Sequence, residues 1–288
     1  MKMAGSLVLA LLWALGLSAG VCLGGNGPEA AFRQGLEQGA QGNFAAAREA
    51  LQQALEADPF YAPALVSLEA VQDVLERKIT PQTGIHLLRA MVQGGRGDWE
   101  SYLAEVGQAL ELAPGYAEAY NHRGNAYLEL GHYDEALSDY DQALKLKPRS
   151  PGIFNNRGVA FRKTGQLDRA LADYNRALEL NPAFAAAYYN RALTYRQKGK
   201  LELALMDFDR ALTLNPRYLE AHFNKALVCE QAGHYQEAAV AFKDFLRQAR
   251  PEYEVHIQHA RERLVSLEQD RRKDFQQAEA RGPDSGQR

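Results

Sequence analysis

Apolar and small residues recur along this chain at the spacing of amphipathic helices. Between residues 117 and 150 there are two such series, formed by Tyr120, Gly124 and Tyr127 and then by Ala136, Tyr140 and Ala143. Steps of three or four residues place the members of each series on one face of a helix. The pattern therefore predicts two amphipathic helices in this stretch.

The same residue types return at a fixed interval of 34 residues. The recurring positions are Gly131, Gly165, Gly199 and Gly233; Ala136, Ala170, Ala204 and Ala238; Pro148, Pro182 and Pro216; and Tyr140, Tyr174, Phe208 and Phe242. A glycine is suited to end the first helix of each repeat in a left-handed conformation, and a proline ends the second helix. The small alanines allow the two helices to pack closely around the aromatic ring.

This arrangement of glycine, alanine, aromatic and proline positions resembles the tetratricopeptide repeat family. The resemblance implies an all-α fold, an α-solenoid of stacked helix-turn-helix repeats that forms a right-handed superhelix. The repeats that match are 117–150, 151–184, 185–218 and 219–252, with a more divergent one at 28–61. Phe245 stands where the last repeat should have an alanine, and Gln38 replaces an aromatic residue in the divergent one.

The remaining segments are expected to complete the solenoid. Residues 62–116 are interpreted as a degenerate repeat with an extra helix, giving three helices in all. Thr80 and Pro81 mark the start of one of them, as an N-cap and a first-turn proline. Residues 253–280 are expected to form a capping helix, since a solenoid must cover its last apolar face. Residues 281–288 are expected to be a disordered tail.

The first 25 residues differ from the rest of the chain. Lys2 is the only charged residue before Glu29, and residues 3–23 are mostly apolar. A cleaved signal peptide and a retained membrane anchor both fit this pattern. Lipidation of Cys22 is a third interpretation, although Val21 departs from the small residue that precedes the modified cysteine of bacterial lipoproteins. Each interpretation predicts an exported chain, periplasmic or membrane-associated in a bacterial envelope.

Composition and motifs exclude several classes of function. The formal net charge is −3, from 33 basic and 36 acidic residues, so no nucleic-acid partner is expected. Two cysteines are too few for a disulfide framework or a cysteine-based zinc site. The chain has no phosphate-binding glycine loop, zinc-binding histidine pair or nucleophile elbow. We therefore expect no enzyme activity, no cofactor and no metal site.

Candidate binding residues lie on the first helix of each repeat, which in the resembling family lines the concave face of the superhelix. The residues expected to line a peptide-binding groove are Asn121, His122, Asn125, Asn155, Asn156, Arg162, Lys163, Tyr189, Asn190, Arg196, Phe223 and Asn224. The carboxamides resemble the asparagine ladder that grips peptide backbones in the O-linked N-acetylglucosamine transferases. Each carboxamide has a donor and an acceptor for an extended chain. Alternatively, the asparagines bond neighbouring helices to one another.

A second recurrence is expected to be structural. Arginine and aspartate recur together as Arg123, Arg157 and Arg191 with Asp139, Asp173 and Asp207. In the last repeat Lys225 and Ala241 occupy the corresponding places. The joint loss of both partners indicates a charge pair, either between the two helices of one repeat or between neighbouring repeats.

These observations favour a non-catalytic scaffold or adaptor that binds an extended segment of a protein partner in the groove. By resemblance, its setting would be cell-envelope assembly or secretion, with possible membrane attachment through residues 1–25. Residues 117–250 carry 19 basic and 16 acidic side chains, which is consistent with an acidic segment. The alternative hypothesis is a self-assembling structural component, a homo-oligomer that associates through residues 62–116 or the C-terminal helix.

Overall fold

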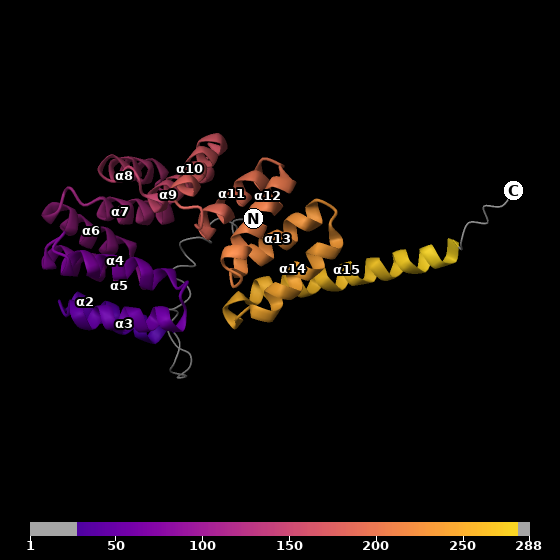
Figure 1. Cartoon of the computed structure of the whole chain (residues 1–288), viewed down its shortest axis with the longest axis horizontal. Helices are drawn as coiled ribbons and strands as arrows, with labels where there is room; N and C mark the ends of the chain where they lie inside the picture. Colours follow the sequence, from indigo (N-terminus) through magenta and orange to yellow (C-terminus); the bar gives the residue numbers. More distant parts are fainter. Residues whose placement is uncertain (1–27, 282–288) are drawn as a thin grey trace. The chain divides into compact units, whose positions relative to one another are not determined.

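A computed structural model describes residues 28–281, and all regular secondary structure in that range is helical (Figure 1). This confirms the predicted all-α fold. The predicted export segment, with Cys22, and residues 282–288 of the predicted tail lie outside the described residues. Between residues 28 and 281, no helix combines the length and apolar character that crossing a membrane requires.

The chain divides into two units, and the first ends at Leu180. Its helices are α2 (Pro28–Ala40), α3 (Phe44–Ala57), α4 (Ala62–Leu75), α5 (Pro81–Gly95), α6 (Trp99–Leu112), α7 (Ala117–Leu130), α8 (Tyr133–Leu146), α9 (Pro151–Lys163) and α10 (Leu167–Leu180). Consecutive helices pack in pairs, α2 with α3, α5 with α6, α7 with α8, and α9 with α10.

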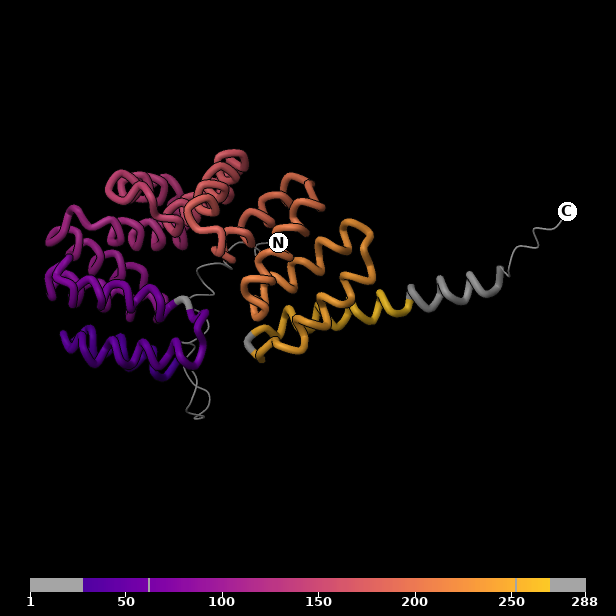
Figure 2. Tube along the Cα trace, viewed as in Figure 1, coloured from indigo at the N-terminus to yellow at the C-terminus, as the bar shows by residue number. Residues whose placement is uncertain are grey.

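The second unit begins at Asn181. Its helices are α11 (Ala185–Gln197), α12 (Leu201–Leu214), α13 (Leu219–Gln231), α14 (Tyr235–Gln248), the short 3₁₀ turn η1 (Pro251–Tyr253) and α15 (Glu254–Arg281). Here α11 packs with α12 and α13 with α14, and the first part of α15 lies against α14 (Figure 2). Ile257, Ala260 and Leu267 of α15 are buried, so this helix covers an apolar face of the unit.

The predicted helix-ending glycines have the expected conformation. Gly131, Gly165, Gly199 and Gly233 have φ values of 79°, 79°, 72° and 80°. This left-handed region is open to glycine without the steric cost that a side chain would add. After each of these glycines the chain reverses and enters the second helix of its repeat.

The ring on the second helix is the centre of each repeat. Tyr140, Tyr174, Phe208 and Phe242 are fully buried. A Cβ added at Gly124 would lie 2.8 Å from Cε1 of Tyr140, and one added at Gly158 would lie 2.7 Å from Cε1 of Tyr174. The two repeats with phenylalanine instead have Ala192 and Ala226 at the glycine position. Glycine is thus required where tyrosine forms the core.

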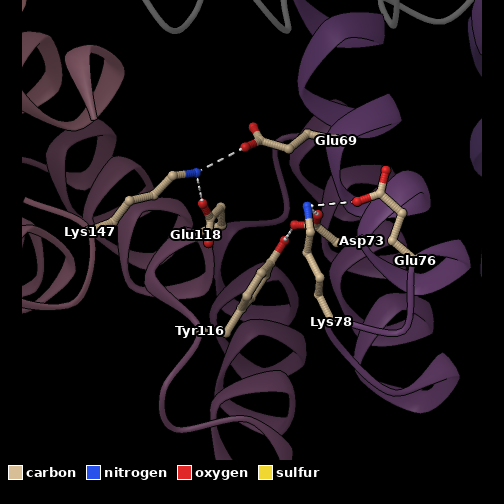
Figure 3. A network of polar contacts seen from close by, with 7 residues as sticks. All are labelled: Glu69, Asp73, Glu76, Lys78, Tyr116, Glu118 and Lys147. Carbon is tan, nitrogen blue, oxygen red and sulfur yellow. Dashed lines mark hydrogen bonds and ion pairs between the residues drawn. The ribbon is translucent and has the colours of Figure 1, made fainter. Parts of the chain in front are cut away.

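Residues 62–116 contain three helices, and a polar network holds the first of them, α4, in place (Figure 3). The Tyr116 hydroxyl donates a 2.8 Å hydrogen bond to Oδ2 of the buried Asp73 on α4. Lys147, just after α8, forms ion pairs with Glu118 on α7 and with Glu69 on α4. The network thus joins α4 to chain segments 43 and 78 residues away.

The first prediction concerns the close approach of Gly158 to the Tyr174 ring. Gly158→Ala should lower the free energy of unfolding by about 1–3 kcal/mol, because a fully buried ring must move to admit the methyl group. This loss exceeds the gain of about 1 kcal/mol in helix propensity. Gly152→Ala on the same helix is the matched control, since a Cβ there would meet no atom within 4 Å. Urea unfolding followed by circular dichroism measures both, and equal midpoints for the two variants would contradict the prediction.

Candidate functional site

Five of the predicted groove residues are buried in their units. The exposed fractions are 7% for His122, 5% for Asn155, 2% for Tyr189, 0% for Asn190 and 8% for Phe223. Their side chains face the packed interior rather than a ligand, which corrects the prediction at these positions. At His122 the burial has an electrostatic consequence, because it lowers the pKa of the imidazole to about 4.

The carboxamides of the first unit bond to one another between α7 and α9. Asn156 Nδ2 donates to Asn121 Oδ1 at 3.0 Å and to Asn125 Oδ1 at 3.1 Å. Asn125 Oδ1 also accepts a 2.8 Å bond from the Tyr140 hydroxyl. This is the inter-helix bonding that the alternative interpretation expected. It uses the Asn121 and Asn125 oxygens and leaves their Nδ2 groups with no hydrogen-bond acceptor among the described residues.

Two cations adjoin this carboxamide cluster at the end of α9. Lys163 lies two turns after Asn156 on the same helix face, because seven residues correspond to about two turns. Neither Lys163 nor the neighbouring Arg162 forms an ion pair within the described part of the chain. Burial and the charge of Arg162 lower the pKa of Lys163, against the opposite effect of Glu129. The Nε of Arg162 is itself buried without a hydrogen-bond partner among the described residues.

The second unit has an arginine in the position that corresponds to Arg162. Arg196 is 34 residues further on. Its Nη1 donates to Asn224 Oδ1 at 3.3 Å and its Nε donates to Gln231 Oε1 at 3.2 Å. Both partners are neutral, and burial lowers the pKa of the guanidinium. Arg196 is therefore a partly buried cation that no carboxylate neutralises within the described residues.

The other recurring arginines are paired as the sequence predicted. Arg123, Arg157 and Arg191 lie 2.7 Å from Asp139, Asp173 and Asp207, respectively, each aspartate being on the second helix of the same repeat. Each of these arginines donates through two of its nitrogens to both oxygens of its aspartate. The first helices of the four regular repeats thus carry two classes of arginine. Arg123, Arg157 and Arg191 pair with an aspartate of the second helix, whereas Arg162 and Arg196 form no ion pair within residues 28–281.

Two residues beside the candidate binding residues were not predicted from the sequence, Glu129 and Gln231. Glu129 follows Asn125 by four residues, so it continues the polar stripe of α7. That spacing was visible in the sequence. Gln231 follows Asn224 by seven residues and repeats Gln197 at the interval of 34 residues, so it too could have been found from the sequence.

The candidate binding residues that are not buried mainly offer hydrogen-bond donors and positive charge in both units. The first unit presents the Nδ2 groups of Asn121 and Asn125 together with Lys163 and Arg162. The second presents Arg196. Such groups suit the carbonyl and carboxylate oxygens of a ligand. No group of three or more potential metal ligands occurs in residues 28–281.

Sequence comparison finds the tetratricopeptide repeat over much of the chain. Models of this repeat match residues 32–68, 107–138, 124–165, 158–196 and 185–218, which together make up just over half of the sequence. No curated protein sequence matches the chain.

Solved structures show the same fold at low sequence identity. PilW, a widely conserved type IV pilus biogenesis factor, is 23% identical with a TM-score of 0.56, over 67% of this chain and 93% of PilW. TTC0263, a thermophilic repeat protein of Thermus thermophilus, is 23% identical with a TM-score of 0.55, over 64% of this chain and 98% of that one. At this identity the likeness concerns the fold alone.

The second prediction follows from the burial of Glu129, which raises the pKa of its carboxyl group from an ordinary value of 4.5 to about 7. Between these two values the folded chain binds more protons than the unfolded chain, so its stability falls as the pH rises. Glu129→Gln stays neutral throughout. The variant should therefore gain about 1–2 kcal/mol over the wild type between pH 4.5 and pH 8, with allowance for partial exposure.

Urea unfolding at a series of pH values measures this difference. Glu135→Gln, at an exposed position on α8, is the matched control and should show no such gain. A difference between wild type and Glu129→Gln that does not change with pH would contradict the assigned burial.

Proposed function

Because the chain belongs to the tetratricopeptide repeat family, we propose that it is a non-catalytic scaffold that binds an extended, acidic segment of a partner protein. Repeats of this family generally act as protein-interaction scaffolds. The proposed contacts are made by polar side chains on the first helices of the repeats. In the first unit these are Asn121, Asn125, Arg162 and Lys163, and in the second Arg196 and Asn224.

The observation that carries this proposal is the contrast between the two classes of arginine. Arg123, Arg157 and Arg191 each have an aspartate partner. Arg162 and Arg196 have none within the described residues, although both are partly buried. A partly buried cation loses water without gaining an opposite charge, which is unfavourable unless a ligand supplies one. Carboxylates of a bound segment would supply that charge.

The carboxamides explain why the ligand would be extended. The Nδ2 groups of Asn121 and Asn125 are one helical turn apart, and both are available to donate to backbone carbonyls of a partner. A hydrogen bond of this kind contributes about 1 kcal/mol net. Two of them give weak and sequence-independent affinity. The cations therefore have to provide most of the selectivity.

The third prediction tests these cations. The probe is a phage-displayed library of random twelve-residue peptides selected on the full chain, and the selected peptides should be enriched in aspartate and glutamate. Replacing both Arg162 and Lys163 with glutamine should weaken peptide binding about tenfold, because two ion pairs of about 0.5–1 kcal/mol each are lost. Binding of the same peptides should also weaken as the salt concentration rises.

Arg176→Gln, on the second helix of the same repeat, is the matched control. Arg176 is exposed and already paired with Glu179 at 2.8 Å, so its replacement should leave binding unchanged. Anisotropy titration measures the affinities, and circular dichroism checks that the helices remain. Selected peptides without acidic residues, or equal affinities for wild type and the double variant, would show the proposal to be wrong.

The proposed setting of the scaffold is the bacterial envelope, with possible attachment through residues 1–25. This part of the proposal rests on the apolar run at residues 3–23 and its single preceding lysine.

The fourth prediction concerns this export. Residues 1–27 fused to alkaline phosphatase, which is active only outside the cytoplasm, should give an active reporter in a bacterial host. Replacing Leu11 and Leu12 with arginine should abolish that activity, because charge interrupts the apolar core. A fusion that is inactive, or active despite both arginines, would contradict export. The intact mass of the exported protein then distinguishes cleavage, retention and acylation at Cys22.

A further inference from the structure

The second unit has a pocket on the side of α13 that does not carry Asn224. The pocket has a volume of about 640 Å³ and is lined by residues of α12, α13 and α14. The α13 residues are His222 and Lys225. With 3.6 residues per turn, these two lie on one face of α13, whereas Asn224 and Gln231 lie on a largely opposite face. The pocket is thus separate from the proposed peptide site.

The pocket lies where the last repeat lacks the recurring arginine–aspartate pair. In an earlier repeat, Arg157 reaches two carboxylates, Asp173 on its own repeat's second helix and Asp141 on the preceding one, both at 2.7 Å. This arrangement fills the space between successive second helices. It shows what the corresponding space holds when the repeat is intact.

In the last repeat the cation is shorter and one carboxylate is missing. Lys225 lies 2.6 Å from Asp209, which corresponds to Asp141. Ala241 stands where the second aspartate would be, and it lines the pocket together with Lys225 and Asp209. The two smaller side chains remove volume that arginine and aspartate occupy elsewhere.

The charge of the pocket is also specific to the last repeat. Asp209, Glu237 and Asp244 line it against one lysine, so the pocket has a net negative charge. Asp244 stands where the two preceding repeats have Arg176 and Arg210. Its ion-pair partner in the structure is Arg247, whose side chain is 74% exposed. This reversal of charge favours a cationic ligand.

An apolar surface adjoins the acidic groups. Val240 lines the pocket and is 59% exposed, and Leu212 contributes a second apolar wall. Met206, one repeat before Val240, is 67% exposed and lies one turn from Asp209 on α12. The corresponding positions in the earlier repeats are Ser138 and Ala172. Among the four regular repeats, large exposed apolar side chains at this position thus occur only in the two that border the pocket.

We propose that this pocket is a second docking site, which takes a lysine or arginine side chain from a basic and apolar segment of a partner protein. The ammonium or guanidinium group binds the carboxylates of Asp209, Glu237 and Asp244. The aliphatic stem lies along Leu212 and Val240, as long cationic side chains do on apolar surfaces. Apolar neighbours in the partner segment cover Val240 and Met206. The scaffold would then hold two partner segments of opposite charge.

The test uses a variant that rebuilds the repeat pattern. Lys225→Arg with Ala241→Asp restores the pair and fills the pocket, and Asp244→Arg restores the charge of the earlier repeats. The probe is a phage-displayed library of random twelve-residue peptides, selected on the wild-type chain and depleted on the rebuilt double variant. The surviving peptides should combine lysine or arginine with leucine, isoleucine, valine, methionine or phenylalanine.

Anisotropy titrations of the surviving peptides provide the measurement. We expect at least tenfold weaker binding to the double variant and to Asp244→Arg, and unchanged binding to Arg176→Gln, at an exposed position outside the pocket. Replacing the basic residue of the peptide with glutamate should abolish binding. The double variant should retain the wild-type helical signal, because it recreates a pair that three other repeats contain.

Three results would overturn the proposal. The first is that no peptide survives depletion on the double variant. The second is that the surviving peptides are acidic, which would place the ligand charge on Lys225 instead. The third is a molecular mass that increases with protein concentration for the wild type and not for the double variant, which would show a second copy of the chain as the occupant.

Discussion

The contact between a small residue on the first helix and an aromatic ring on the second determines the geometry of each repeat from residue 117 to residue 248. The ring is completely buried, and the small residue sets how near the helices approach. Where the ring is Tyr140 or Tyr174, the partner is glycine. Where it is Phe208 or Phe242, the corresponding residue is alanine. This constraint selects the face of the first helix that is buried, and so it also selects the residues that stay partly exposed.

The same constraint gives arginine two different roles. An arginine one residue before the small position, such as Arg157 before Gly158, lies beside the second helix and finds an aspartate there. An arginine four residues after the small position, such as Arg162, lies beyond the reach of that aspartate. Its charge is unbalanced within the described residues, although its Nε is buried. Position along the helix, rather than residue type, thus separates the arginines paired between helices from those that we propose for binding.

Much of the fold follows from the period of 34 residues, because corresponding positions in successive repeats have similar packing. The glycine turns, the buried rings and the arginine–aspartate pairs all belong to this class. The candidate site was less predictable. Asn155 and Asn156 are neighbours in the sequence, yet one is buried and the other is partly exposed. A step of about 100° around a helix decides between these outcomes, and no polar pattern marked the boundary.

Contacts between distant segments could not be predicted from periodicity. Lys147 joins Glu69 and Glu118 through geometry that depends on where the non-repeating helix α4 packs (Figure 3). The pKa of Glu129 likewise depends on the neighbouring repeat, because the charge of Lys163 lowers it against the effect of burial.

Departures from the period carry a different kind of information. A repeat that has lost both Arg and Asp, as at Lys225 and Ala241, keeps its buried ring Phe242 and so keeps its fold. Packing therefore does not require the pair at this place. Loss of a dispensable pair would leave a neutral surface if nothing replaced it. Here Asp244 adds an acidic group and Val240 an exposed apolar one. Exposed apolar area beside carboxylates is unusual on a solvated helix face, and it supports the docking site that we propose there.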